Sequence, residues 1–179
     1  MKLLQREEEF AWFVALLQRE GVRSYLEIGS KFGASLDRIA RSMPKGSKVV
    51  SVDLPGEADS KTSLVNVVTN LSRDGYDVHM VWGDSTSERT VAMVKQHGPF
   101  DAVFIDANHT LPYVTKDWEN YGPMGRIVAF HDIAYRPKPN KPPKPIEVDK
   151  LWNVIKGGYR HEECCLDGPF NGIGVLWRE

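Results

Sequence analysis

The sequence contains few features expected of a secreted, membrane-spanning or nucleic-acid-binding protein. It has two cysteines, Cys164 and Cys165, and adjacent residues point to opposite faces of a strand, which is poor geometry for a structural disulfide. We expect free thiols and a reducing, cytoplasmic location. No apolar run is long enough to cross a membrane. With a formal net charge of -1, the chain also lacks the positive field that would hold a nucleic-acid backbone.

The composition that remains predicts one globular domain covering residues 1–179. Hydrophobic residues make up 41% of the chain and charged residues 26%, and no internal repeat is present. Because nucleic acid and membrane are disfavoured as partners, we expect a small-molecule substrate. Assembly into a homo-oligomer stays open at this point.

Short apolar runs alternate with amphipathic stretches along most of the chain. After a helix near the N-terminus, further helices are predicted over residues 33–43, 59–73, 86–97, 111–121 and 146–156. Strands are predicted over residues 24–28, 48–54, 77–82, 100–106, 126–133, 159–166 and 173–178. This alternation favours a Rossmann-like, doubly wound α/β fold, with a mostly parallel seven-stranded sheet and a C-terminal antiparallel hairpin.

The first strand-to-helix turn, in YLEIGSKFGAS, has the composition of a ligand-binding loop. Glycines at 29 and 33 allow a tight turn and close approach of a ligand, and we expect a side chain at Gly33 to fill the loop. Lys31 stands where the dinucleotide motif G-x-G-x-x-G has its middle glycine, which disfavours a pyrophosphate. Asp53 ends the second predicted strand, where a carboxylate can accept hydrogen bonds from both hydroxyls of an adenosine ribose.

Taken in order, EIGSKFG, VVSVDL, WGDS and FDAVFIDANH resemble the motifs of class I S-adenosylmethionine-dependent methyltransferases over nearly the whole chain. The resemblance implies S-adenosyl-L-methionine as the cofactor. The residues that it implies as cofactor contacts are Glu27, Gly29, Ser30, Gly33, Asp53, Leu54, Asp84, Ser85 and Asp106. For Asp84 the alternative is a helix N-cap.

Acids and histidines follow two further predicted strands. Asp106 and His109 follow the fourth strand, and His131 and Asp132 follow the fifth, so neighbouring strand ends should bring the four residues together. Two carboxylates there favour a hard cation such as Mg²⁺, with Asp106 and Asp132 as ligands. A histidine titrates near neutral pH, so we expect His109 to be the catalytic base beside Asp106.

The same two segments resemble macrolide-sugar O-methyltransferases and cephalosporin-hydroxylase-like proteins, within the type 24 methyltransferases. That resemblance implies that His131 stands at a metal-ligand position that is often acidic. The alternative is that His109 and His131 cap turns or pack, and that Asp106 serves only the cofactor.

The leading hypothesis is therefore methyl transfer to an oxygen of a small hydroxylated acceptor, such as a sugar or natural product, with divalent-metal assistance left open. A nicotinamide-dependent oxidoreductase and a non-catalytic cofactor-binding module are the alternatives. Residues 136–145, with five prolines and four basic residues, predict an extended loop. That loop is either a basic lid over an anionic substrate or a solvated connection.

Overall fold

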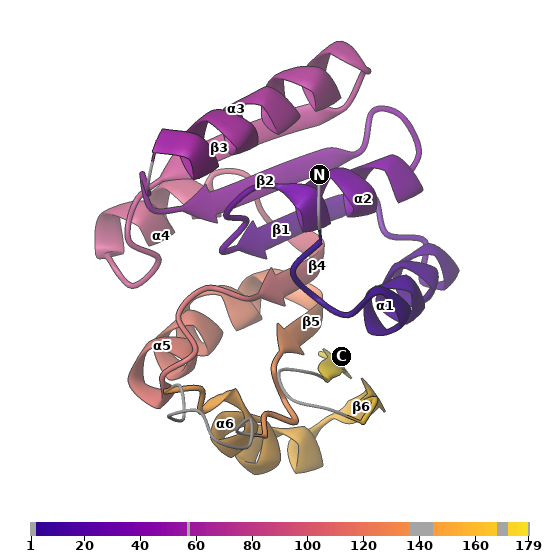
Figure 1. Ribbon diagram of the computed structural model, residues 1–179, viewed down its shortest axis with the longest axis vertical. Helices are drawn as coiled ribbons and strands as arrows, with labels where there is room; N and C mark the ends of the chain where they lie inside the picture. Colours follow the sequence, from indigo (N-terminus) through magenta and orange to yellow (C-terminus); the bar gives the residue numbers. More distant parts are fainter. Residues whose placement is uncertain (1–2, 57, 137–144, 168–171, 179) are drawn as a thin grey trace.

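The computed structural model describes residues 3–56, 58–136, 145–167 and 172–178. Within these residues the chain forms a seven-stranded sheet with the order β3-β2-β1-β4-β5-β7-β6 (Figure 1). The strands are β1 (Ser24–Ile28), β2 (Lys48–Asp53), β3 (Asp77–Trp82), β4 (Phe100–Ile105), β5 (Gly125–His131), β6 (Arg160–Cys164) and β7 (Ile173–Trp177). Strands β1 to β5 are parallel, whereas β7 is antiparallel to both β5 and β6.

Helices cover both faces of this sheet. They are α1 (Glu7–Arg19), α2 (Ala34–Ser42), α3 (Ala58–Arg73), α4 (Glu88–Lys95), α5 (Leu111–Tyr121) and α6 (Val148–Ile155), with short 3₁₀ helices η1 (Gly122–Met124) and η2 (Lys156–Gly158). One buried cluster contains side chains of α1, α2 and α3, and the other contains side chains of α4, α5 and α6. No helix among the described residues is both long and apolar enough to span a bilayer.

The central strands are apolar on both sides because each face of the sheet is covered. In β4, Ala102 and Phe104 pack in the cluster with α1 to α3, and Val103 and Ile105 pack in the cluster with α4 to α6. Successive side chains of a strand point to opposite faces, so a nearly continuous apolar run fills both layers. The doubly wound α/β fold predicted from the alternation of strands and helices is confirmed.

Several predicted boundaries differ from the structure by one or two residues, and two of these differences have a clear local reason. The fifth strand ends at His131 rather than at residue 133, because Asp132 has a φ of +61°, a left-handed conformation that breaks the strand. Helix α4 begins at Glu88 rather than at residue 86, because the Ser87 side chain caps it by accepting a hydrogen bond from Thr90 N. The predicted antiparallel pairing of the two C-terminal strands is confirmed, and β7 lies between β5 and β6 in the sheet.

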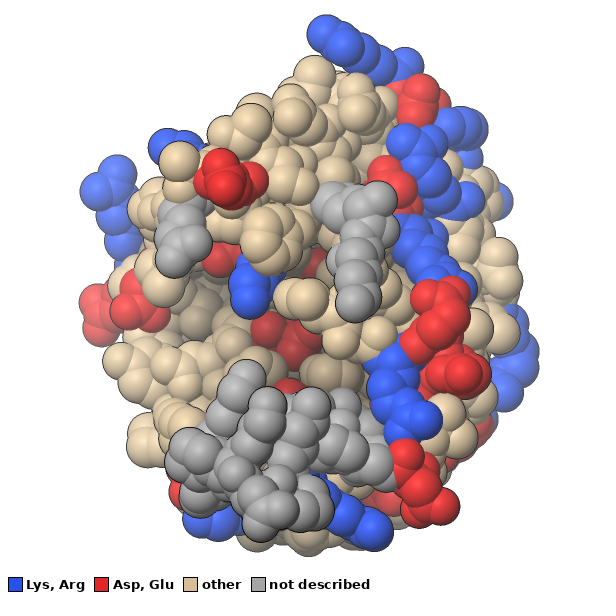
Figure 2. Space-filling view, viewed as in Figure 1, with Lys and Arg blue, Asp and Glu red and all other residues tan. Residues whose placement is uncertain are grey.

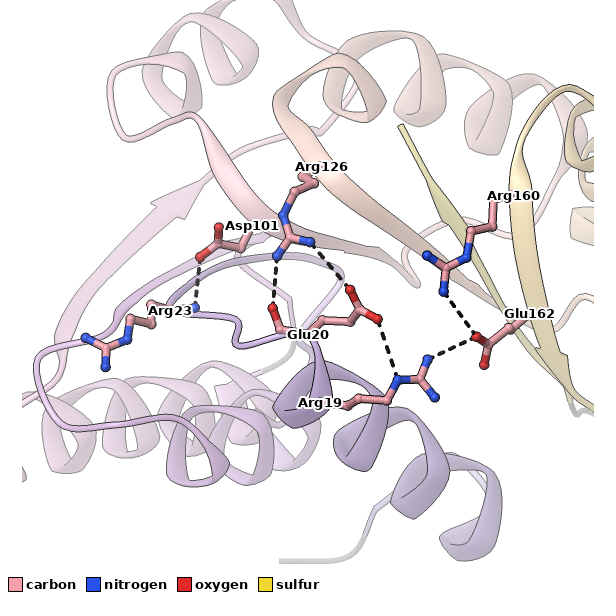
Figure 3. A network of polar contacts seen from close by, with 7 residues as sticks. All are labelled: Arg19, Glu20, Arg23, Asp101, Arg126, Arg160 and Glu162. Atoms are coloured by element: carbon pink, nitrogen blue, oxygen red, sulfur yellow. Dashed lines mark hydrogen bonds and ion pairs between the residues drawn. The ribbon is translucent and has the colours of Figure 1, made fainter. Parts of the chain in front are cut away.

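A polar network fixes the C-terminal end of α1 against the sheet (Figure 3). Arg126, on β5, donates to the backbone oxygen of Glu20 at 3.1 Å, and Arg19 pairs with Glu162 of β6 at 3.0 Å. These side chains are partly exposed, so each contact contributes little stability. At the other end of α1, Gln5, just before the helix, donates a hydrogen bond to Asp106.

The backbones of β1 and β4 approach each other closely where the two strands end at the carboxyl edge. Gly29 has a φ of +95°, and a Cβ atom there would lie 2.5 Å from the backbone oxygen of Asp106. The Asp106 backbone N in turn donates to the oxygen of Ile28 at 2.9 Å. Any side chain at position 29 would therefore separate the two strand ends.

Replacing Gly29 by alanine should lower the free energy of unfolding by about 3 kcal/mol or more, because it adds a backbone clash to left-handed strain. Gly75→Ala is the matched control, since Gly75 has a φ of +90° and open space around it, so only strain of about 1 kcal/mol is expected. Urea unfolding of both variants measures the difference. Equal losses would contradict the proposed close approach.

Candidate active site

A cavity of about 860 Å³ opens at the carboxyl edge of the sheet. Each of the first five strands contributes to its lining through the residues at its end: Gly29, Asp53, Asp84, Asp106 and Asp132. Figure 2 shows a hollow in this face, with acidic side chains in its depth. The location is the one expected for a ligand site in an open α/β sheet.

Most of the residues predicted for the site line this cavity. They are Gly29, Ser30, Asp53, Leu54, Asp84, Ser85, Asp106, His109, His131 and Asp132. Two predicted cofactor contacts, Glu27 and Gly33, are not among the lining residues.

Glu27 lies beneath the glycine-containing loop and is fully buried. Its carboxyl group accepts hydrogen bonds from the Tyr25 hydroxyl at 2.6 Å and from the Ser35 hydroxyl at 2.8 Å. Burial raises the pKa of Glu27 to about 7, against the lowering effect of these hydrogen bonds. The side chain thus supports the loop from within the core.

Gly33 serves packing, contrary to the expectation that a side chain there would fill the loop. It has a φ of +83° and precedes α2, and a Cβ atom would lie 3.0 Å from Leu64 and 3.1 Å from Val67, both on α3. A substitution at Gly33 would therefore press on the core between α2 and α3. The sequence pattern placed the glycine in the correct turn but could not show which way a side chain would point.

Asp53 and the loop are joined directly. The backbone N of Lys31 donates to Asp53 Oδ2, and Lys31 itself has a φ of +50°. The residue that replaces the middle glycine of the dinucleotide motif thus adopts a left-handed conformation despite its side chain. Partial burial raises the pKa of Asp53, and the hydrogen bond from Lys31 opposes this effect.

Asp84 lines the cavity and also stabilises its own turn. Its Oδ1 accepts hydrogen bonds from the backbone N of Thr86 at 2.8 Å and from the Thr86 hydroxyl at 2.7 Å, which lower the pKa of Asp84. The N-cap of α4 is Ser87 and not Asp84. Nearby, the backbone oxygen of Ser85 accepts a hydrogen bond from the Tyr121 hydroxyl at 2.7 Å, which ties this turn to α5.

The four acids and histidines that follow β4 and β5 meet as predicted. The Nδ1 atom of His131 lies 3.2 Å from Asp106 Oδ1 and 3.5 Å from Asp132 Oδ2. His109 Nδ1 lies 3.4 Å from the same oxygen of Asp132. Both histidines therefore face Asp132, and His131 lies between the two carboxylates.

Electrostatic interactions keep this cluster charged despite its burial. Burial alone would lower the pKa of His131, but the charge of Asp106, together with hydrogen bonding to both acids, raises it to about 10. Burial would raise the pKa of Asp106, but His131 outweighs it and the pKa falls below its usual range. At neutral pH the cluster thus contains an imidazolium and the carboxylate of Asp106.

The expected magnesium site does not fit this arrangement. Among the described residues, no group of three or more His, Cys, Asp or Glu side chains is placed to hold a metal ion. The three predicted ligands, Asp106, His131 and Asp132, instead form an ion-pair cluster with the imidazole between the carboxylates. The prediction of a magnesium site at these strand-end acids therefore finds no support in this arrangement.

Sequence reasoning missed several residues that line the cavity. Leu4 and Gln5 come from the segment before α1, Ser35 from the first turn of α2, and Tyr113 from the first turn of α5. Gln5 donates a hydrogen bond to Asp106 although 101 positions separate them. Ser35 could have been noticed, since it follows directly on the glycine loop, but nothing near Gln5 indicates its partner.

The loop that carries His109 is anchored by Glu147. The backbone N of Glu147 donates to the oxygen of His109 at 2.8 Å, and its carboxylate accepts from Leu111 N at 3.0 Å. Pro145 and Ile146, just before it, line the cavity. Most of the predicted basic lid, residues 137–144, lies outside the described residues.

A family model described as a methyltransferase domain matches residues 26–133, more than half of the chain. The chain therefore belongs to this type 24 methyltransferase-domain family, as the resemblance of its motifs implied. A comparison with curated proteins found no match.

Solved structures of methyltransferases share the fold. An O-methyltransferase from Bacillus cereus, in complex with S-adenosylhomocysteine, is 18% identical, with a TM-score of 0.70 over 97% of this chain and 82% of that one. The O-methyltransferase TomG from Streptomyces achromogenes, involved in tomaymycin synthesis and solved with S-adenosylmethionine, is 17% identical, with a TM-score of 0.69 over 99% and 82% of the two chains. A methyltransferase from Geobacter sulfurreducens is 13% identical, with a TM-score of 0.65 over 97% and 79%.

Glu27 gives the fold a specific pH dependence. Because its pKa is raised from 4.5 to about 7 in the folded chain, its stabilising effect is complete below pH 4.5 and is lost as the pH rises through 7. The loss is on the order of 3 kcal/mol. Glu27→Gln should abolish this part of the pH dependence. Urea unfolding of both proteins between pH 4.5 and 8 measures it, and parallel curves would show that Glu27 does not titrate in this range.

Proposed function

We propose that the chain is an S-adenosyl-L-methionine-dependent methyltransferase that methylates an oxygen of a small hydroxylated acceptor, such as a sugar or natural product. The observation that carries the proposal is the carboxyl-edge cavity, which contains both the glycine loop with Asp53 and the pair of His109 and Asp132. The family membership supports methyl transfer, and the solved relatives with bound S-adenosylmethionine or S-adenosylhomocysteine support the cofactor.

The cavity residues fit an adenosine cofactor. Gly29 and Ser30 form a turn without bulky side chains, and Asp53 offers a carboxylate at the end of β2 for the ribose hydroxyls. Leu54, on the cavity wall, is 58% exposed, and a flat adenine ring would cover its apolar surface. Asp84 and Ser85 lie on the same wall at the end of β3 and would contact the base.

When bound, S-adenosyl-L-methionine supplies an electrophilic methyl group on sulfur. The residues of this chain hold the acceptor and remove its proton. With Nδ1 of His109 directed to Asp132, the opposite ring nitrogen, Nε2, is left to accept the proton of an acceptor hydroxyl. Asp132 orients the ring and stabilises the positive charge that the ring gains, as the acid of a catalytic triad does.

The cavity also supports a small acceptor. Its volume is typical of a pocket for a cofactor and a small substrate. Two large apolar side chains, Leu4 and Tyr113, are exposed by 62% and 43% although they lie on its wall. An acceptor with an apolar face beside its hydroxyl group would cover them.

Calorimetric titration with S-adenosylmethionine, S-adenosylhomocysteine and NAD tests the cofactor. We expect the first two to bind and NAD not to bind. Asp53→Ala should weaken binding by about 10- to 100-fold, the effect of losing hydrogen bonds to a charged group. Asp77→Ala, which removes an exposed acid outside the cavity, is the control. Binding of NAD alone would indicate an oxidoreductase and overturn the proposal.

Screening hexoses, phenols and catechols for release of S-adenosylhomocysteine tests the reaction. With an acceptor that turns over, His109→Ala should lower kcat by about 10²- to 10⁴-fold, the usual effect of losing a general base, with little change in cofactor affinity. His79→Ala changes a histidine outside the cavity and should leave kcat unaltered. If kcat is undiminished in His109→Ala, that histidine has no catalytic role. If the protein binds the cofactor but turns over none of the acceptors, it is a non-catalytic module.

A further inference from the structure

The centre of the acid and histidine cluster is occupied by a side chain. The ring of His131, at the end of β5, is 7% exposed, and its Nδ1 lies 3.2 Å from one oxygen of Asp106 and 3.5 Å from one oxygen of Asp132. Among the described residues, no group of three or more acidic, histidine or cysteine side chains, this cluster included, is placed to hold a metal ion.

We propose that His131 takes the place of a divalent cation between Asp106 and Asp132, so that the site works without a bound metal. What this inference says about catalysis rests on the proposed function. The metal titration that tests it does not depend on methyl transfer. His131 is then a positioning residue, which holds the two acids in place without itself reacting.

The carboxylate oxygens are already in use. Asp106 Oδ1 faces His131, and Asp106 Oδ2 accepts the hydrogen bond from Gln5. Asp132 Oδ2 faces both His131 and His109. Two buried atoms of the cluster, Asp132 Oδ1 and His131 Nε2, have no hydrogen-bond partner among the described residues. Because Mg²⁺ needs several oxygen ligands about 2.0–2.1 Å away in octahedral geometry, an ion between the two acids would require His131 to give up its present contacts with them.

The contacts of His131 link the two acids directly. Two carboxylates buried side by side repel each other unless a group that interacts favourably with both lies between them. The ring of His131 occupies that position, because its Nδ1 atom contacts an oxygen of each acid. Asp132 adopts a φ of +61° directly after His131, a strained conformation that persists only when the surroundings enforce it.

Titration with Mn²⁺, followed by the paramagnetic resonance signal of the free ion, tests this inference. Mn²⁺ prefers the same oxygen ligands as Mg²⁺. The wild-type chain should not take up the ion at this site, and its affinity for S-adenosylhomocysteine should be equal in Mg²⁺ and in EDTA. His131→Asp, which replaces the cation with a third carboxylate, should bind one Mn²⁺ per chain. Adding Asp106→Asn to that variant should abolish the binding.

Two results would overturn the inference. One is stoichiometric Mn²⁺ binding by the wild-type chain that is lost in the single variant Asp106→Asn. The other is a folded His131→Asp chain that binds no Mn²⁺, since His131 would then not be what excludes the ion. Should His131→Asp fail to fold, the wild-type titration and its Asp106→Asn control decide alone. The direct metal titration needs neither cofactor nor acceptor, so its outcome is independent of the proposed methyl transfer.

Discussion

The close approach of β1 and β4 at their carboxyl ends is the constraint on which the site depends. The backbone N of Asp106 donates to Ile28 O, and the backbone N of Gly29 donates to Val52 O, both at 2.9 Å. These bonds hold the glycine loop against the start of the segment that carries Asp106, with no room for a side chain at position 29. The cavity lies in front of this junction because β1 lies between β2 and β4 in the sheet, where the order of the strands reverses.

The charges of the site depend on this junction, because Asp106 lies at it. Asp106 is buried beside the loop, and an isolated carboxylate there would be unstable in its ionised form. Two segments far apart in the sequence provide its partners: Gln5 before α1, and His131 at the end of β5, which also contacts Asp132. Helix α1 thus has polar contacts at both ends, with Asp106 through Gln5 and with β5 and β6 through Glu20 and Arg19 (Figure 3).

Much of this could be predicted from the sequence, because strands that are buried on both faces and then end in an acid mark the carboxyl edge of a parallel sheet. Asp53, Asp106 and Asp132 were placed at that edge for this reason. The pattern could not show that the Glu27 side chain lies in the core, or that a side chain at position 33 would be directed into it. Two residues of one turn can face opposite sides. Nor could it show Gln5, whose contact with Asp106 depends on the packing of a whole helix.

The magnesium prediction finds no support in the structure, and the reason is a general one. Residue types were read as ligands one at a time, whereas the affinity of a site for a cation depends on the sum of its charges and on which oxygens are free. A histidine next to one carboxylate is a plausible ligand, but a buried histidine between two carboxylates becomes a cation itself, because each acid favours its protonated form. His131 therefore determines both the charge of the cluster and the space within it. The fold is shared with the solved methyltransferases, but a shared fold does not fix the chemistry of the site, which depends on side chains such as this one.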